Sequence, residues 1–310
     1  MDVVPVGIMQ WKYGPFNAIE ADGKIYGRGA SDMKAGLMAA VAAMINLKEQ
    51  NIPLKGAIRL LATIGEETGA IGAKQLTDSG YADDLDALII GEPTKNQMVT
   101  AHKGVIWLKL ETTGQTAHGS APQLGVNAID HMLYFLEMFR KKINLSRYSD
   151  SILGVSTASL NVLQGGNATN VVPDHCVAEL DIRTVPTLDH TRFIEELQEL
   201  GKKVSKKMDN FHIKMEITND LPALQTDFTD PFVQLASKTI TYITGKEQKE
   251  TGSPGFTDGS RFIMAKKKFP VIILGPGTGE MAHQPDEYVI IKDYQDSISI
   301  YEYIAREFLK

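Results

Sequence analysis

The stretch Leu60–Gly72, LLATIGEETGAIG, passes from an apolar run directly into two adjacent glutamates and then into glycines and small residues. The apolar run begins at residue 55 as KGAIRLLATI and predicts a buried strand, while residues near 68–79 predict a helix. A strand that leads into a helix is the repeating unit of an α/β protein. The end of a buried strand is an unusual place for two neighbouring carboxylates, Glu66 and Glu67, and their position needs a chemical explanation.

Strands and helices alternate on both sides of this stretch. Residues 24–29 (KIYGRG) and 85–91 (LDALIIG) predict strands, and residues 31–50 predict a helix that Ser31 caps. Strands that are nearly all apolar and are separated by helices indicate a parallel sheet that is covered on both faces. We therefore expect an α/β fold with a mostly parallel sheet covered by helices.

The pattern changes in the middle of the chain. Between residues 104 and 217 the predicted order is strand, helix, strand, strand, helix, strand, which is the split unit of a ferredoxin-like sandwich. The α/β alternation resumes after this block. We expect a catalytic domain formed by residues 1–103 and 218–310, with residues 104–217 as an inserted ferredoxin-like α+β lid and dimerisation domain.

The composition indicates a soluble globular protein. Its 310 residues are 43% hydrophobic and 23% charged, and no apolar run is long enough to cross a bilayer. The net charge of -6 disfavours a nucleic-acid partner, and the lysines of GKKVSKKM and AKKKF are typical of solvated helix faces. Cys176 is the only cysteine and the first residues lack a signal-peptide pattern, so we expect a cytoplasmic protein without nucleic-acid or membrane partners.

Acidic residues and one histidine follow four of the predicted strands, where each strand ends. In open α/β sheets, functional side chains gather at the carboxyl ends of the strands. Four carboxylates at one edge would repel one another and raise their pKa values unless a cation neutralised them. The pattern therefore predicts a metal site built from Asp32, Glu66, Glu67, Glu92 and His283.

Each of these residues also has an ordinary structural explanation. A carboxylate in the first turn of a helix interacts favourably with the helix dipole, and Glu92 and His283 can be plain loop residues. These explanations account less well for the five residues together than for any one of them alone. Nucleotide binding through YGRGASD is a further alternative, but only two glycines are suitably placed and Asp32 would repel a phosphate.

The types of donor favour a hydrolytic metal site. Carboxylate oxygens with an imidazole nitrogen and no thiolate are typical of Zn²⁺, Mn²⁺ or Co²⁺. A pair of ions about 3.5–4 Å apart needs a bridging carboxylate, further ligands on each ion and a separate base for the attacking water. One glutamate of the pair would bind metal, and the other would take a proton from water and hand it to the leaving amine.

Several longer motifs follow one another along essentially the whole chain. They are YGRGASDMKAGLMAAV, IGEETGAIGA, IIGEPT, TTGQTAHGSAPQLGVNAI, GGNATNVVPD, ELDIRTVP, GFTDGSRF and GPGTGEMAHQPDEYV. The order resembles that of the dizinc aminoacylase and exopeptidase family. This family includes succinyl-diaminopimelate desuccinylases, acetylornithine deacetylases, aminoacylases and glutamate carboxypeptidases, and it has a catalytic domain with an inserted dimerisation lid.

The resemblance implies a role for each residue of the predicted metal site. Asp32 would bridge two ions, Glu67 and His283 would bind one of them, and Glu92 would bind the other. Glu66 would be the general base. The residues named by the resemblance are those that the ends of the predicted strands bring together.

The resemblance also implies roles for residues outside the metal site. His118 of the lid would reach the site of a partner subunit and stabilise the tetrahedral oxyanion. Asn170, Arg183 and Thr257 would contact the substrate. Arg183 can grip a carboxylate through two hydrogen bonds, and a salt bridge at a strand end is the alternative for this residue.

The start of the chain departs from the family pattern. The family opens its site with a His-x-Asp motif; here Asp2 is present, but the histidine would fall one residue before Met1. We therefore expect Asp2 among the catalytic residues, with one metal ligand and the elements before it missing from this chain. Of the two Zn²⁺ sites of the family, which can also hold Co²⁺ or Mn²⁺, one is expected to be weak here. A catalytically impaired dimeric protein is the alternative from another functional class.

The expected activity is that of a metal-dependent amidohydrolase that removes an N-acyl group from a small amino acid. N-succinyl-diaminopimelate is the favoured substrate, and acetylornithine and small peptides are alternatives. His102 and Lys103 stand where desuccinylases of the family often have paired arginines near the distal carboxylate of the substrate, and this departure keeps the other substrates as alternatives. The expected assembly is a homodimer through the lid.

Overall fold

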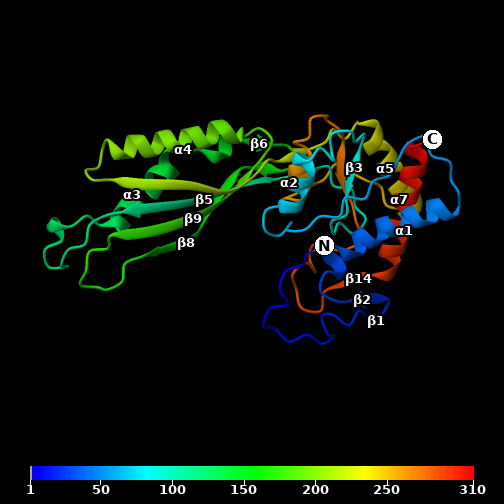
Figure 1. The fold of residues 1–310 in the computed structure, drawn as a ribbon, viewed down its shortest axis with the longest axis horizontal. Helices are drawn as coiled ribbons and strands as arrows, with labels where there is room; N and C mark the ends of the chain where they lie inside the picture. The colour runs from blue at the N-terminus through cyan, green and yellow to red at the C-terminus, as the bar shows by residue number, and fades with distance from the viewer. Residues whose placement is uncertain (1) are drawn as a thin grey trace. The chain divides into compact units, whose positions relative to one another are not determined.

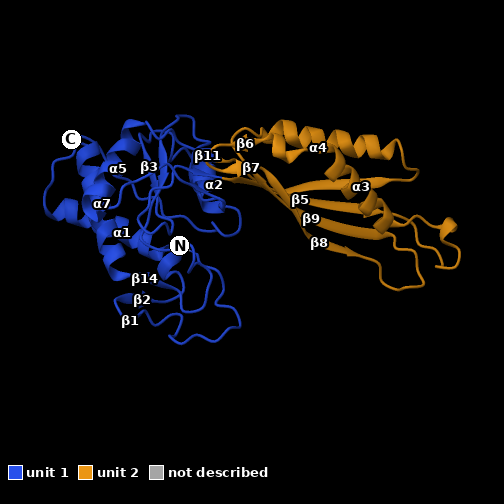
Figure 2. Ribbon diagram, turned by 180° about the vertical axis from the view of Figure 1, so that it is seen from behind, with its two compact units in different colours: residues 1–102, 224–310 blue, residues 103–223 orange. Residues whose placement is uncertain are grey.

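The computed structural model describes residues 2–310, which form two compact units (Figures 1 and 2). Unit 2 comprises residues 103–223, and unit 1 comprises the chain on either side of it. The second boundary follows residue 223 rather than 217, because β10 (His212–Leu221) stays paired with β5 (Gly104–Thr113) as far as Leu221. Among residues 2–310, no helix combines the length and the apolar character that crossing a membrane requires.

Three long helices of unit 1 share a hydrophobic core. They are α1 (Ala35–Glu49), α5 (Pro231–Thr244) and α7 (Ile291–Phe308), and α7 packs against both of the others (Figure 1). α5 has its N-cap at Asp230, whose carboxylate accepts a hydrogen bond from the backbone N–H of Phe232. The core side chains from these helices and from the strands beside them include Ala39, Ala43, Met98, Phe232, Val233, Ala236, Ile240, Ile272, Leu274, Ile300 and Ile304.

The strands of unit 1 form small sheets, and the predicted mostly parallel sheet is not confirmed. β3 (Leu88–Ile90) pairs in parallel with β13 (Val271–Ile273), and β4 pairs in parallel with β12 but antiparallel with β11. β1, β2 and β14 form a separate antiparallel sheet. The bounds of the remaining strands are Ile19–Ala21 (β1), Lys24–Tyr26 (β2), Ala101–His102 (β4), Leu224–Gln225 (β11), Gly252–Ser253 (β12) and Tyr288–Ile290 (β14).

The stretch 55–64, predicted as a buried strand, belongs to no sheet. Within residues 2–310, no backbone hydrogen bond involves residues 57–62, and Leu60 and Ile64 are 40% and 58% exposed. The stretch instead lines a cavity of about 390 Å³ that β3, α1 and α7 also border. The prediction was wrong because an apolar sequence favours burial but does not supply the neighbouring strand that completes a sheet.

Helix α1 begins later than the sequence predicts. Residues Ala30–Lys34 form a π-type turn, and no side chain caps the start of α1 at Ala35. The Ser31 hydroxyl donates to the carbonyl oxygen of Thr278 (3.0 Å) and accepts from the Thr278 N–H (2.6 Å). The predicted N-cap role of Ser31 is therefore wrong, because the hydroxyl joins the turn of Asp32 to the loop that carries His283.

Unit 2 has the order of strands and helices predicted from the sequence. Its four long strands form an antiparallel sheet in the order β10-β5-β9-β8. The two helices lie on one face of this sheet (Figure 2). The bounds of these elements are Ala128–Lys142 (α3), Thr157–Gly165 (β8), His175–Thr184 (β9) and His190–Ser205 (α4); the short strands are Ser149–Asp150 (β6) and Gly154–Val155 (β7).

The core of unit 2 lies between this sheet and its helices. Successive side chains along β5 and β9 alternate between buried and more exposed positions, as expected for strands with one covered face. The largest buried side chains of α3 and α4 meet them there. The largest fully buried members are Ile106, Leu108, Leu110, Met132, Phe135, Ile182, Phe193 and Leu197.

Candidate metal centre

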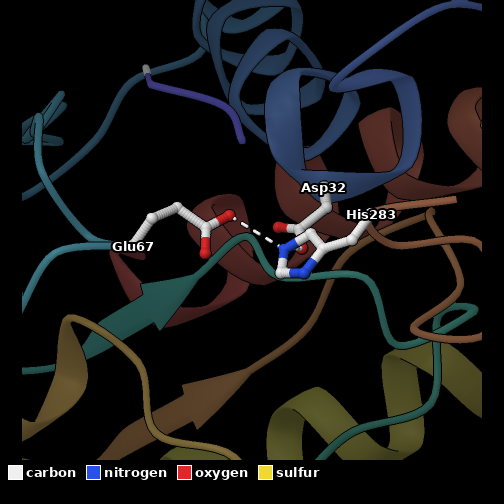
Figure 3. A group of neighbouring side chains, drawn as sticks. All are labelled: Asp32, Glu67 and His283. Atoms are coloured by element: carbon white, nitrogen blue, oxygen red, sulfur yellow. Dashed lines mark hydrogen bonds and ion pairs between the residues drawn. The ribbon is translucent and has the colours of Figure 1, made fainter. Parts of the chain in front are cut away.

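Three side chains from separate segments of unit 1 converge on one point (Figure 3). Asp32 lies in the turn before α1, Glu67 lies before α2 (Ile71–Asp78), and His283 lies in the loop between β13 and β14. One ligand atom from each residue lies within 4.8 Å of the others. Nε2 of His283 is 3.0 Å from Oε1 of Glu67 and 3.4 Å from Oδ2 of Asp32.

The donors and their spacing fit a divalent cation. Ligands at about 2.0–2.2 Å from a tetrahedral zinc ion are roughly 3.3–3.6 Å apart, which is close to the separations observed here. Two carboxylates and one imidazole suit Zn²⁺, Co²⁺ or Mn²⁺ and leave a coordination position open. Burial, followed by the negative charge of Glu67, raises the pKa of Asp32, and a bound cation would favour its charged form.

Two further carboxyl groups border the three ligands. Burial raises the pKa of Glu92 well above its usual value, and the charge of Asp32, with which it shares a hydrogen bond, adds to this effect. Burial also raises the pKa of Glu66 to about 9, and the carboxylates of Asp258, Glu67 and Asp32 contribute. Without a cation, Glu66 therefore holds a proton at neutral pH, and burial favours the protonated form of Glu92.

Metal binding should consequently release protons and change how stability depends on pH. Glu66 has a higher pKa in the folded chain than its ordinary 4.5, so the metal-free protein should lose stability as the pH rises from about 4.5 to about 9. A bound cation should flatten this slope because it favours the charged carboxylates. Thermal unfolding between pH 5 and 9, with Zn²⁺ and with a chelator, measures both slopes.

Proton release can be measured directly by calorimetric Zn²⁺ titrations in two buffers of different protonation enthalpy. The observed heats of binding should differ between the two buffers, and equal heats would contradict the prediction.

Close backbone packing fixes the segments that carry Asp32 and Glu92. Gly36 lies in the first turn of α1, and a Cβ atom there would be 1.9 Å from the carbonyl oxygen of Gly91. A Cβ atom on Gly275 would be 2.6 Å from the carbonyl oxygen of Glu92. Both positions therefore require glycine, because a side chain would push Glu92 away from Asp32.

Asp2 lies beside the segment that carries Glu66. Its Oδ1 accepts a hydrogen bond from the backbone N–H of Gly65 at 2.8 Å. Burial raises the pKa of Asp2, but backbone hydrogen bonds from Asp2 itself and from Gly65 outweigh this effect and leave the pKa below its ordinary value. Asp2 is thus a charged carboxylate next to the predicted general base.

His118 and Asn170 lie together in unit 2. The segments that contain them bridge at His118 and Val171, and the Gly119 N–H donates to the Asn170 carbonyl oxygen at 2.7 Å. Both residues are exposed. The backbone N–H of Ser120 donates to Nδ1 of His118 at 3.1 Å, so the proton of the neutral imidazole is on Nε2.

Arg183 lies at the other end of the sheet of unit 2. It pairs with Val105 near the start of β5, whereas His118 follows the end of that strand. Its guanidinium bonds to both carboxylate oxygens of Asp181, at 2.7 and 2.9 Å. The alternative stated for Arg183, a salt bridge at the end of a strand, is therefore formed with Asp181. Arg183 is separated from His118 by the length of β5.

Thr257 lies in unit 1 just before α6 (Gly259–Phe262). It is 6% exposed, and its hydroxyl accepts from the Gly259 N–H at 3.0 Å. Its neighbour Asp258, which the sequence did not single out, lies close enough to Glu66 for its charge to raise the pKa of Glu66. Thr63 donates to Asp258 at 2.5 Å, and burial raises the pKa of Asp258. The signal available in the sequence was a charged residue inside the motif GFTDGSRF.

Comparisons with known proteins find relatives over the whole chain. The profile of the peptidase family M20/M25/M40 matches residues 1–307. A probable succinyl-diaminopimelate desuccinylase of Staphylococcus aureus (strain MSSA476) is 36% identical over 337 aligned positions, which cover 100% of this chain and 82% of the relative. An acetylornithine deacetylase of Buchnera aphidicola subsp. Acyrthosiphon pisum is 30% identical, covering 93% and 74%. The crystal structure of an M20 family metallo-carboxypeptidase from Sulfolobus solfataricus has a TM-score of 0.79 at 21% identity, covering 98% and 82%, and therefore shares the fold.

Proposed function

This chain belongs to peptidase family M20/M25/M40, and we propose that it removes the acyl group from an N-acyl amino acid. It is a hydrolase that acts on amide bonds. The proposed substrate is N-succinyl-diaminopimelate, after the name of the Staphylococcus aureus relative. The observation that carries the proposal is the convergence of Asp32, Glu67 and His283 next to Glu66.

The proposed cofactor is a divalent ion held by Asp32, Glu67 and His283, with a second ion between Asp32 and Glu92. Such ions supply Lewis acidity that polarises the scissile carbonyl and acidifies water. The carboxylate of Glu66 would accept a proton from the attacking water and then deliver it to the leaving nitrogen. Its position beside the ligands, and a pKa that is sensitive to local charge, support this role.

The lid function of unit 2 is also a proposal. His118 would act on the active site of a partner subunit in a homodimer, where its Nε2–H would donate to the developing oxyanion. The exposure of His118 and the hydrogen bond that keeps Nδ1 unprotonated support this assignment. A surface residue that serves a second chain needs no contact with the metal ligands of its own chain.

His118→Ala should lower kcat by about 10²–10³-fold and change KM little, because the oxyanion forms only on the way to the tetrahedral intermediate. Mixing this variant with Glu66→Gln tests whether His118 of one subunit acts in the active site of the other. A mixed dimer would contain one site with both residues intact, so activity should return on mixing. A purified heterodimer that stays as inactive as both parents would contradict the proposal, and His175→Ala, another histidine of unit 2, serves as the control.

Asn170, Arg183 and Thr257 are proposed to contact the substrate. Arg183 would have to exchange its carboxylate partner Asp181 for a carboxylate of the substrate, a replacement that preserves both hydrogen bonds. His102 is fully buried in β4, which argues against direct recognition of the substrate by this residue. The lone cysteine, Cys176, is buried and supports a proposed cytoplasmic location.

A substrate panel tests the function. Initial rates should be measured for N-succinyl-diaminopimelate, N-acetylornithine and a dipeptide, each with Zn²⁺ and with Co²⁺. The highest kcat/KM is expected for the succinylated substrate; a preference for acetylornithine would favour the deacetylase alternative. Bound metal without hydrolysis of any substrate would favour the catalytically impaired dimer.

A further inference from the structure

A buried ion pair contacts the two segments that carry the candidate metal ligands Asp32 and His283. Nη1 of Arg28 is 2.6 Å from Oε2 of Glu287, and the two residues are only 4% and 1% exposed. Removing two charges from water is unfavourable unless good geometry and additional hydrogen bonds compensate. The partners of the remaining donor and acceptor atoms therefore indicate what this pair stabilises.

The Glu287 carboxylate binds the backbone of the turn that carries Asp32. Oε2 accepts from the Gly29 N–H, and Oε1 accepts from the N–H groups of Ser31 and Asp32, each at 2.9 Å. The Gly27 N–H also donates to the Glu287 carbonyl oxygen at 2.8 Å. One side chain thus fixes the backbone of a metal-ligand residue directly at its own N–H.

The Arg28 guanidinium binds the loop that carries His283. It donates to the carbonyl oxygens of His283 and Gln284, both at 3.3 Å, and to that of Pro5 at 3.4 Å. His283 has a φ of 66°, in the left-handed region that is unfavourable for a residue with a side chain. The hydrogen bond to its carbonyl oxygen helps to hold it in this conformation.

We propose that Arg28 and Glu287 are positioning residues, which hold Asp32 and His283 at their metal-binding separation before the ion binds. The inference rests on the proposed metal centre and extends it. Glu287 sets the position of one ligand and Arg28 that of the other, and the ion pair between them couples the two loops. Outer partners of this kind typically raise metal affinity about 10–100-fold because the ligands need less reorganisation.

The substitutions that test this role separate positioning from general stability. Glu287→Gln keeps the shape of the side chain but directs an amide N–H₂ at backbone N–H donors. Arg28→Lys keeps the charge but lacks the planar fork that reaches several carbonyl oxygens. Ile240→Val removes one methylene from the core of unit 1, away from the ligand loops, and is the matched destabilised control.

The readouts are the Co²⁺ dissociation constant, the visible absorption spectrum of the Co²⁺-loaded protein and the Tm without metal. Both Glu287→Gln and Arg28→Lys should weaken Co²⁺ binding by about 10–100-fold and change the ligand-field bands. Glu287→Asp should bind Co²⁺ with an affinity between those of the parent and Glu287→Gln. Ile240→Val should lower the Tm without changing Co²⁺ affinity or the spectrum.

The outcomes separate this inference from the proposed function. If the parent protein binds no Co²⁺, the metal centre itself is wrong. If the parent binds Co²⁺ and Arg28→Lys keeps the parental affinity and spectrum, the positioning role is overturned while the metal centre stands. Should Glu287→Gln fail to fold, Arg28→Lys and Glu287→Asp still decide the question.

Discussion

Replacing Glu66 with glutamine should lower kcat by about 10²–10⁴-fold and leave the metal content unchanged. The amide has nearly the shape of the carboxylate but cannot take a proton from water. Because Glu66 lies beside the three converging ligands and is not one of them, its neutralisation should not release the ion. The substitution would also remove one negative charge from the surroundings of Asp32. Rates should therefore be measured at saturating Zn²⁺, with the metal content of the same samples determined by mass spectrometry.

The neighbouring glutamate provides the matched control. Glu67→Gln should lower both the metal content and kcat, because one Oε of Glu67 belongs to the converging set of donors. The two substitutions change the same functional group one residue apart, so they differ only in the role of the carboxylate. A Glu66→Gln protein that keeps more than about a tenth of the parental kcat would disprove the base assignment.

The proximity of three of the predicted ligands was expected from their positions after apolar or small-residue segments. Asp32, Glu67 and His283 each come after an apolar or small-residue segment, and such segments were expected to end on one side of unit 1. The three side chains lie close together even though the segment before Glu67 is not a strand. The strand β2 before Asp32 also belongs to a separate antiparallel sheet, so the three side chains converge without the single parallel sheet that was expected.

The buried ion pair that holds the ligand segments was not predictable from the sequence. Arg28 and Glu287 stand in motifs that the sequence analysis quoted, but charged residues in loops are usually solvated. Their burial depends on the approach of two segments that are far apart along the chain, which no local pattern encodes. Asp258 was missed for the same reason, since its contact with Thr63 also joins distant segments.

The two units differ in how well the sequence specified their folds. In unit 2 the strands have one covered face, and the alternation along β9 identifies both the strand and its buried side. In unit 1 the strands are short and apolar, so the sequence does not distinguish a parallel from an antiparallel neighbour. The segment 55–64 shows the limit most clearly, because sheet formation depends on a partner as well as on apolar character.

The second large effect is expected in metal stoichiometry, where the chain should bind one divalent ion tightly and a second one weakly. Asp32, Glu67 and His283 supply three donors that include an imidazole. Among residues 2–310, the donors proposed for the second position are Asp32 and Glu92, and the raised pKa of Glu92 opposes the charged form that binds an ion. His283→Ala should abolish the tight ion, with a loss larger than the roughly 10–100-fold typical of outer partners. Glu92→Gln should affect only the weak one.

A histidine placed directly before Met1 should convert the weak position into a tight one. Asp2 accepts a hydrogen bond from the Gly65 N–H, which places Asp2 beside the segment that carries Glu66 and Glu67. An added imidazole would give the ion shared by Asp32 and Glu92 a third donor and should raise kcat as well as metal content. An extension of equal length with alanine at the same position is the control, because it adds the backbone without the ligand. Co²⁺ titration of both proteins measures the two affinities, and two equally tight ions in the alanine protein would show that another residue already completes the second position.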